Sequence, residues 1–295
     1  MNRKPFKDFL VGILVGIMSM MPGASGGIIA VIFGMYERLI ADVADIGHKL
    51  LKDLRFIIPV GLGILLGLVV CAVGIYALLQ NWEIPLMFFF AALIVFQIPD
   101  LYRLCNSSDD TGPSMRNLVA YVIGFIVMLS FLFVGSTESD ISLIDLGATD
   151  IIVLFVIGLL VALSKIVPGL SGAAILLAIG VYTPLMDLVG GMDMTVIVDR
   201  VAALIPLGLI VGVLGISKIV DHLLNRYRRS TYYCIMGITL GSIVTVAVQA
   251  LQGLTGDMIL PSVVCIAIGL AFGYCLSRVS AKYAEETISE KPTGA

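Results

Sequence analysis

One lysine and two short motifs carry the residue types most able to do chemistry in this chain. Residues 22–26 have the sequence Pro-Gly-Ala-Ser-Gly, and residues 168–172 have the sequence Pro-Gly-Leu-Ser-Gly. Lys165 lies three residues before the second motif, inside an apolar segment. A half-helix that starts after such a break presents unpaired backbone N–H groups and a partial positive charge, which attract an anion such as phosphate. The ammonium of Lys165 adds a full charge, so the pattern predicts an anion-binding site.

The elements that position these residues are predicted to lie in a membrane. Of the 295 residues, 59% are hydrophobic and 13% are charged, and the mean hydropathy is +1.06. This composition is typical of an integral membrane protein and excludes a nucleic-acid-binding class. The five cysteines and two histidines show no metal-ligand spacing, so we expect no metal and no other cofactor. A coupling ion, either a proton or sodium, is left open.

The candidate site residues also have purely structural interpretations. Small residues let two helices pack closely, and a lysine can extend its amine to the membrane interface. We favour a functional role because a charge at the bilayer centre costs about 2.5 to 3.5 kcal/mol and requires an interior partner. Glu37 and Arg38 either adjoin the site or form a solvated ion pair. The candidate substrate-binding residues are Gly23, Ser25, Gly26, Gly27, Lys165, Gly169, Ser171, Gly172, Glu37 and Arg38.

The two motifs belong to an internal repeat. A constant difference of 146 residues superposes their surroundings and pairs Ser25 with Ser171. Further along, Ile-Pro-Val-Gly at residues 58–61 is echoed by Ile-Pro-Leu-Gly at residues 205–208. A repeat at this spacing predicts a duplicated module.

Each Pro-Gly-x-Ser-Gly motif divides an apolar run into two short parts. Proline and glycine interrupt a helix, and residues 9–21 and 23–36 would each rise only about 20 Å, against a hydrocarbon core of about 30 Å. We therefore predict two re-entrant hairpins with the motifs at their tips. Broken backbone at membrane depth must be buried in protein or line a cavity, which makes the tips candidate binding sites.

The predicted fold class is an all-α integral membrane protein with an inverted-topology repeat, in which each half has one re-entrant hairpin and three transmembrane helices. Three crossings per half place the second hairpin on the opposite face, as in secondary transporters. The predicted boundaries are a first repeat at 1–135 (hairpin 9–36, spans 56–79, 86–101 and 118–135), an outer linker at 136–150, a second repeat at 151–280 (hairpin 151–186, spans 204–219, 232–251 and 259–276) and a cytoplasmic tail at 281–295.

The distribution of charges predicts the orientation. Lysine and arginine gather in the segments that a cytoplasmic N-terminus places inside, whereas residues 136–150 carry four acidic residues and no basic one. Cytoplasmic loops are enriched in basic residues, so both termini are predicted to be cytoplasmic.

The paired motifs, extended by Gly34 and Tyr36 in the first copy and by Gly180 and Tyr182 in the second, resemble the PopT-type undecaprenyl-phosphate (polyprenyl-phosphate) transporter family, formerly a domain of unknown function. The resemblance covers nearly the whole chain. It implies a flippase of the bacterial inner membrane that returns undecaprenyl phosphate to the inner leaflet, for lipid-carrier recycling in peptidoglycan biosynthesis. It also implies that the two tips and Lys165 hold the phosphate.

Two alternatives stay open from the residues alone. One is a carrier for a small water-soluble anion, which would use the same tips. The other is a membrane lipid phosphatase, although no nucleophile and base pair is recognisable, and we expect no enzymatic activity. The expected partners are a lipid-linked phosphate substrate and bilayer lipids, and a monomer and a homo-oligomer are both compatible with the sequence.

Overall fold

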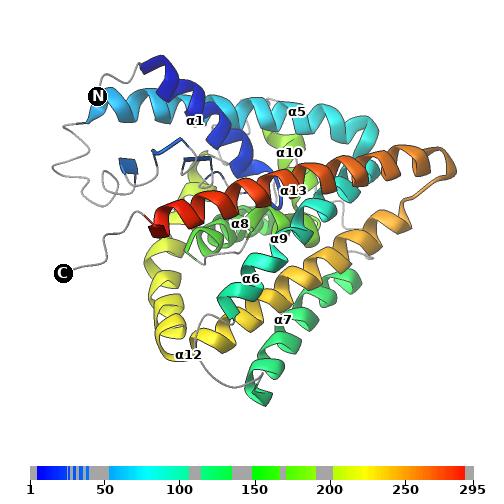
Figure 1. Cartoon of the computed structure of the whole chain (residues 1–295). Helices are drawn as coiled ribbons and strands as arrows, with labels where there is room; N and C mark the ends of the chain where they lie inside the picture. The colour runs from blue at the N-terminus through cyan, green and yellow to red at the C-terminus, as the bar shows by residue number, and fades with distance from the viewer. Residues whose placement is uncertain are drawn as a thin grey trace.

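A computed structural model describes residues 5–24, 26, 29–30, 33–35, 38–39, 53–105, 114–134, 148–166, 171–190 and 202–289. This part of the chain forms helices and no β-strand. The helices, drawn in Figure 1, are α1 (Pro5–Met20), α5 (Leu54–Val95), α6 (Ile98–Cys105), α7 (Met115–Val134), α8 (Ala148–Ile166), α9 (Gly172–Ala178), α10 (Tyr182–Gly190), α12 (Ala202–Gln252) and α13 (Ile259–Ser289).

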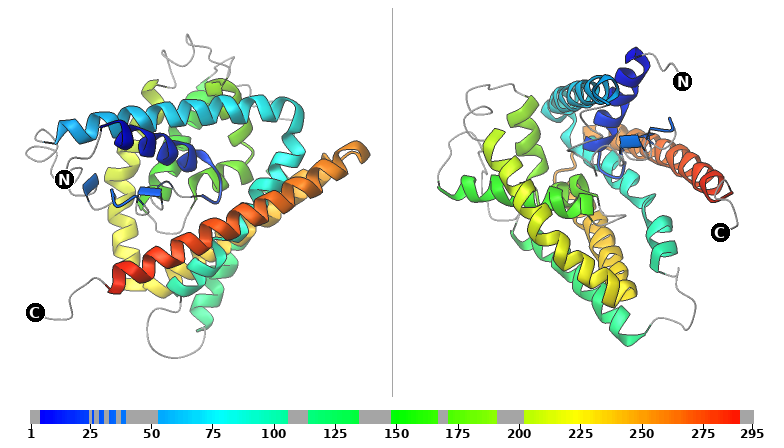
Figure 2. Two further views of the ribbon diagram at one scale, coloured as in Figure 1. Left: turned by 45° about the horizontal axis from the view of Figure 1, so that its top comes forward. Right: turned by 90° about the vertical axis from the view of Figure 1, so that its left-hand side faces the viewer.

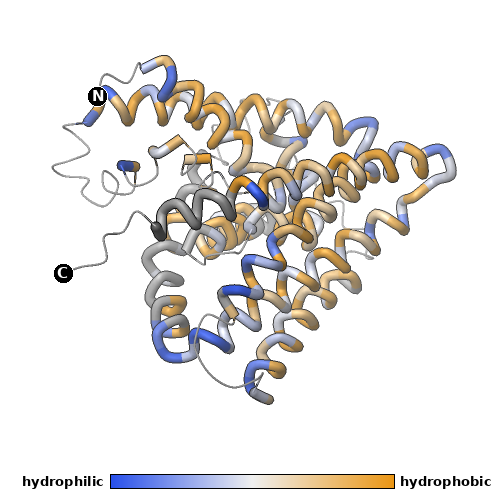
Figure 3. Tube along the Cα trace, in the orientation of Figure 1, coloured by the Kyte–Doolittle hydropathy of each residue, from blue (hydrophilic) through white to orange (hydrophobic). Residues whose placement is uncertain are grey.

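The outer surface of the described helices is apolar. Figure 3 shows hydrophobic residues along most of the helices and hydrophilic residues mainly at the helix ends and bends. Leu65, Ile126 and Leu260 are 61%, 58% and 73% exposed on long apolar helices. Four helical stretches are long and apolar enough to cross a membrane, namely Leu54–Arg103, Met115–Leu132, Asn225–Gln252 and Gly256–Val279. The chain is therefore an all-α, multi-pass membrane protein.

Two of the long helices bend sharply at equivalent places. Helix α5 has a non-helical residue at Trp82 (φ −135°, ψ 30°), and α12 has one at Tyr227 (φ −133°, ψ 37°). The two residues are 145 positions apart, 227 minus 82. Figures 1 and 2 show the bend of α5 and the bend of α12 at opposite sides of the molecule. Each bend divides its helix into two arms that diverge from the bend (Figures 1 and 2).

The first arms of these helices pack against α1 and α8 through glycine. A Cβ added to Gly12 of α1 would lie 3.1 Å from the Cα of Gly63, and one added to Gly158 of α8 would lie 2.9 Å from the Cα of Gly208. These contacts are close enough that only glycine fits without a backbone shift. These contacts make Gly208 the counterpart of Gly63. The similarity of residues 58–61 to residues 205–208 instead pairs Gly208 with Gly61, where an added Cβ would meet no atom within 4 Å. The sequence alignment of residues 58–61 with 205–208 is therefore out of register by two positions.

The second arms pack against the remaining long helices in a reciprocal way. In α7, a Cβ on Gly124 would collide with the carbonyl oxygen of Cys234 in α12. In α13, a Cβ on Gly269 would lie 2.8 Å from the carbonyl oxygen of Phe89 in α5. Gly269 lies 145 positions after Gly124, and Cys234 lies 145 positions after Phe89, so the two contacts correspond residue by residue. The same helix contact thus occurs twice, once between α7 and α12 and once between α13 and α5.

The apolar runs around the two motifs are interrupted, as the proline and glycine residues predict. Helix α1 ends at Met20 and a turn follows at residues 21–24, so residues 9–36 do not form one continuous helix. The 16 residues of α1 rise about 24 Å, less than a full hydrocarbon core. Helix α8 ends at Ile166, and the short helix α9 begins at Gly172.

Beyond each motif, the chain ends its second half-helix in the same way. Gly34 and Gly180 both have positive φ, +62° and +78°. The residue after each glycine closes the turn: Met35 donates its N–H to the carbonyl oxygen of Ala30 (2.8 Å), and Val181 donates its N–H to that of Leu176 (3.0 Å). This is the Schellman arrangement, in which a left-handed glycine closes a helix. The segments after the two motifs therefore share a backbone turn at a spacing of 146 residues, 180 minus 34.

Three hydroxyl-bearing residues recur at three- and four-residue spacing on the second arm of α12, namely Thr239, Ser242 and Thr245. This spacing predicts a polar stripe on one face of the helix, and that face points to the interior. Thr239, Ser242 and Thr245 are at most 4% exposed. The hydroxyl groups of Thr239 and Ser242 donate to carbonyl groups of their own helix, and that of Thr245 donates to Met128 of α7 (3.1 Å). These hydroxyl groups thus have partners and act in packing.

Candidate functional site

The two motifs meet at a partly buried contact. The backbone N–H of Gly23, in the first motif, donates to the side-chain oxygen of Ser171, in the second, with an N to Oγ distance of 3.4 Å. Gly23 has a positive φ of +81°, and its Cα packs against the backbone of Leu93 and Ile94 in α5. A side chain at this position would be strained and would also collide with α5. Glycine is therefore required where the first motif reaches the second.

Ser171 has a second role at the start of α9. It is the N-cap residue, and its side-chain oxygen also accepts the N–H of Ala174 (3.3 Å). A serine hydroxyl has two acceptor positions and one proton. Both acceptor positions are used here, and the residues that the structure describes provide no acceptor for the proton. Within the described residues, the Ser171 oxygen thus acts as an acceptor that joins the first motif to the start of α9.

Tyr182, at the start of α10, makes a second link between the regions of the two motifs. Its side chain is 2% exposed, and its hydroxyl group donates to the carbonyl oxygen of Met20, the last residue of α1 (3.1 Å). Its ring packs edge-on against Phe90 of α5, with 5.7 Å between ring centroids. This geometry is favourable for aromatic pairs. The end of α1 is thus tied to α10 and α5.

A serine and a glycine cross in each hairpin. In the first, a Cβ on Gly26 would collide with the side-chain oxygen of Ser19, and in the second, one on Gly172 would lie 2.5 Å from that of Ser164. Ser19 and Ser164 donate to carbonyl groups one turn earlier in α1 and α8 (both 2.7 Å). The serines therefore face the following half-helix at close range, and glycine there is needed for packing.

Lys165 lies in the last turn of α8, directly after Ser164. Its backbone is described, and its side chain lies outside what the structure describes. Four further predicted site residues lie entirely outside the described part of the chain, namely Ser25, Gly27, Gly169 and Glu37. The structure thus brings together Gly23, Ser171 and, through Ser164, the backbone of the turn that carries Lys165.

Arg38 lies apart from the contact between the motifs. Its guanidinium forms two hydrogen bonds with the carboxylate of Asp53 (2.6 and 2.5 Å) and stacks over the ring of Phe56 at 4.0 Å. The side chains of Arg38 and Asp53 are 43% and 27% exposed. Arg38 thus forms a partly exposed ion pair with Asp53, a partner that the sequence did not indicate, while its suggested pairing with Glu37 lies outside the described residues.

Two interior contacts near the motifs did not emerge from sequence reasoning. Gln249 donates its side-chain amide to the carbonyl oxygen of Ala178, at the end of α9 (3.2 Å). Glu83, next to the bend of α5, forms a side-chain hydrogen bond with Thr183 of α10. Tyr182 could have been found, because Tyr36 repeats it at the 146-residue spacing. The partners of Gln249 and Glu83 lie far away in the chain and leave no sequence pattern.

Comparisons with known proteins identify the family of this chain. A family described as "VCA0040-like: Undecaprenyl phosphate translocase-like" matches residues 15–255. A polyprenyl-phosphate transporter of Staphylococcus aureus (strain NCTC 8325 / PS 47) is 27% identical over 174 residues, which are 59% of this chain and 61% of the relative. The match thus spans about three fifths of the relative's length. No solved structure matches. The resemblance stated from the paired motifs is confirmed, and the chain belongs to the VCA0040-like family of undecaprenyl phosphate translocase-like proteins.

Proposed function

We propose that this protein is a transporter that carries undecaprenyl phosphate across the bacterial inner membrane and so recycles the lipid carrier. The family description names undecaprenyl phosphate, and the printed name of the Staphylococcus aureus relative is polyprenyl-phosphate transporter. The observation that carries the proposal is the contact between the two motifs, where the N–H of Gly23 meets the oxygen of Ser171. Two breaks in apolar helices thereby form one polar spot inside the protein.

The phosphate head group binds between the motifs in this proposal. The hydroxyl proton of Ser171 donates to a phosphate oxygen, and the ammonium of Lys165 neutralises the negative charge. Removing a phosphate from water is costly without such partners. Because α9 has only seven residues and one of its N–H groups is already bonded to Ser171, the helix dipole contributes little. The lysine charge therefore carries most of the electrostatic stabilisation.

The transport cycle follows from an inverted repeat of two hairpins that enter from opposite faces. The equivalent bends at Trp82 and Tyr227 and the equivalent glycine contacts of α1 with α5 and of α8 with α12 support this repeat. In such architectures one repeat rocks against the other around a central site. The phosphate site between the hairpins then opens to each leaflet in turn, with both termini in the cytoplasm.

The test is a leaflet-resolved translocation assay with undecaprenyl phosphate in proteoliposomes. A hydrogen bond to a charged group is worth about 1.5 to 3 kcal/mol, so Lys165→Ala should slow translocation roughly 10- to 150-fold. Lys7→Ala, which removes an exposed lysine of α1, serves as the matched control and should keep the wild-type rate. Normal translocation by Lys165→Ala would remove the lysine from the mechanism.

The same assay separates the alternatives. A short-chain phosphate ester that is transported as well as the full-length lipid would indicate a carrier for water-soluble anions. Release of inorganic phosphate from the lipid would indicate a phosphatase. The absence of any wild-type translocation of undecaprenyl phosphate would reject the proposed function.

A further inference from the structure

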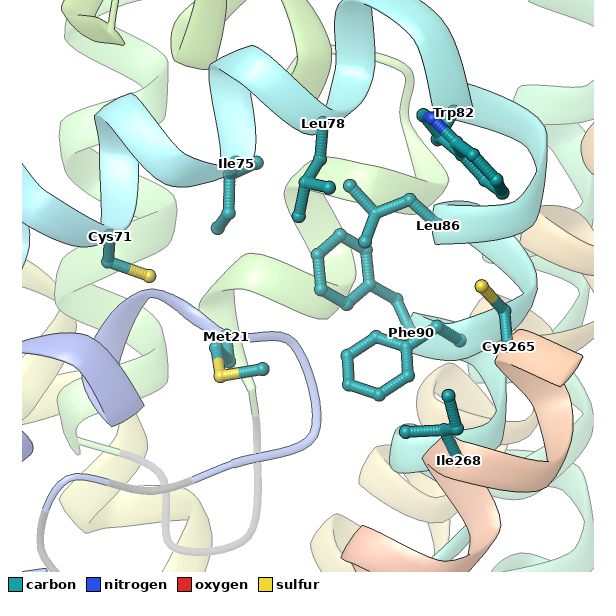
Figure 4. A pocket seen from close by; sticks show the side chains of 10 residues that line it. Met21, Cys71, Ile75, Leu78, Trp82, Leu86, Phe90, Cys265 and Ile268 are labelled. Atoms are coloured by element: carbon teal, nitrogen blue, oxygen red, sulfur yellow. The ribbon is translucent and has the colours of Figure 1, made fainter. Parts of the chain in front are cut away.

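An apolar groove lies beside the first motif. It has a volume of about 300 Å³ and is lined by side chains from the end of α1, from both arms of α5 and from α13. Figure 4 shows Met21, Ile75, Trp82, Phe90, Cys265 and Ile268 around this space. Trp82 and Ile268 are 48% and 54% exposed. Both lie on stretches apolar and long enough to cross a membrane, so the groove opens sideways to the hydrocarbon.

The groove lies next to the contact between the motifs. Met21, which lines it, is two residues before Gly23, whose N–H reaches Ser171. Phe90 of α5 lines the groove and also packs against the ring of Tyr182. The Tyr182 hydroxyl group donates a hydrogen bond to the carbonyl oxygen of Met20. A molecule with its head group at the motifs would therefore have its next atoms in the groove.

We propose that this groove holds the isoprene units of the substrate that are nearest to its phosphate. This inference rests on the proposed function and adds the place and chemistry of the tail. A volume of about 300 Å³ is at the small end of ligand pockets, so only the first part of the chain fits and the remainder stays in the bilayer. The groove supplies the lateral opening that a lipid substrate needs.

The chemistry next to the phosphate selects the occupant. In a polyprenyl phosphate, hydrocarbon is attached directly to the phosphate oxygen. In a phospholipid, a glycerol unit with two ester groups comes first, and those polar groups would need hydrogen-bond partners. The groove is apolar directly beside Met21 and has aromatic walls, among them Trp82 and Phe90. It therefore fits a prenyl chain better than a diacyl lipid.

Photo-crosslinking tests the position of the tail. The probe is full-length undecaprenyl phosphate with a diazirine in the isoprene unit next to the phosphate, added to the whole protein in proteoliposomes. We expect crosslinks at groove residues such as Ile75 and Ile268, suppressed by unlabelled undecaprenyl phosphate but unaffected by excess phosphatidylglycerol. Crosslinks confined to the exposed surface of α7, for example Ile126, would overturn the proposal. Equal competition by phosphatidylglycerol would also overturn it, because the groove would then be an acyl-chain site.

A pair of tryptophan variants on α13 tests the effect on transport. Ile268→Trp fills the mouth of the groove, whereas Leu270→Trp adds the same side chain to an exposed position outside it. We expect Ile268→Trp to reduce translocation of undecaprenyl phosphate by roughly tenfold or more, the scale on which an apolar pocket discriminates by size. Leu270→Trp should keep the wild-type rate, and both variants should bind inorganic phosphate, which has no isoprene unit, like wild type.

These outcomes separate the groove from the proposed function. If wild type translocates the lipid and Ile268→Trp does so equally fast, the groove assignment fails while the transporter assignment stands. If wild type does not translocate the lipid, the proposed function fails whatever the variants do.

Discussion

The two bends of the molecule have the same backbone and opposite electrostatic surroundings. At Trp82 the neighbouring residues are Asn81 and Glu83. At Tyr227 the neighbours are Arg226 and Arg228, and the guanidinium of Arg226 lies 5.8 Å from the centre of the Tyr227 ring. Acidic and basic bends at opposite sides of the molecule fit the proposed inverted repeat, because basic residues are enriched on the cytoplasmic side of membrane proteins.

The helix contacts show why such a repeat is hard to see in the side chains. Gly241 of α12 packs against Met128 of α7, and Gly273 of α13 packs against Phe96 of α5. At the 145-residue spacing, Gly241 corresponds to Phe96 and Gly273 to Met128, since 241 minus 96 and 273 minus 128 are equal. The same helix crossing thus occurs twice. The glycine lies on α12 in one crossing and on α13, the counterpart of α7, in the other. A crossing needs one small residue, and either helix can provide it.

The hairpins differ in the same way. Ser19 and Ser164 take equivalent places, because each is bonded to its own helix and packs against the glycine that follows, Gly26 or Gly172. Lys165, the residue after Ser164, therefore corresponds to Met20, the residue after Ser19. At the contact between the motifs, the first contributes a backbone N–H and the second a serine oxygen.

The largest expected effect tests the equivalence of the glycine contacts. Gly208→Leu should destabilise the folded protein by about 3 kcal/mol or more, because its side chain would collide with the backbone of α8. Gly63→Leu should do the same against α1. The matched controls are Gly215→Leu and Gly61→Leu, whose added side chains have open space and which should fold normally. Thermal unfolding in detergent measures the difference, and a stable Gly208→Leu protein would contradict the contact.

The next effect concerns the charge that only the second hairpin carries. Lys165→Met, which gives this position the residue of its counterpart Met20, should slow translocation roughly 10- to 150-fold through the loss of a charged hydrogen bond of about 1.5 to 3 kcal/mol. The leaflet-resolved assay measures the rate, with Lys7→Met on the exposed side of α1 as the control. A wild-type rate for Lys165→Met would show that transport does not need this charge.

Ser171→Ala should have a smaller effect on folding and a measurable one on binding. It removes the N-cap of α9 and the acceptor for Gly23, with an expected cost of about 0.5 to 2 kcal/mol. It also removes the proposed donor to phosphate, so the KM for undecaprenyl phosphate should rise. Ser130→Ala is the control, because that exposed hydroxyl bonds only its own helix. A shift in thermal stability with an unchanged KM would limit Ser171 to a structural role.

The smallest effect is expected at Arg38. Its ion pair with Asp53 is exposed, and such pairs contribute about 0 to 1 kcal/mol. Arg38→Gln and Asp53→Asn should therefore lower thermal stability equally and slightly, with a difference that shrinks at high salt. If Arg38→Gln slows translocation strongly and Asp53→Asn does not, Arg38 acts on the substrate instead.

The sequence predicted several structural features for reasons that are local. Pro22 and the glycines after it interrupt an apolar run wherever they occur in a helix, so the end of α1 at Met20 was predictable. The spacing of Thr239, Ser242 and Thr245 placed them on one face, and that face is buried. The partners of Ser171 and Arg38 were not predictable, because Gly23 and Asp53 approach them only after distant helices have packed.

By itself, the amino-acid sequence determined that this chain is an all-α membrane protein with two interrupted helices, and its paired motifs led to the family. Only the tertiary structure decided that Gly63 is the counterpart of Gly208, that Gly23 meets Ser171 and that an apolar groove adjoins this contact. The physical reason is that composition and helix breaks depend on neighbours along the chain. Register, contact and cavity shape depend on how helices far apart in sequence cross one another.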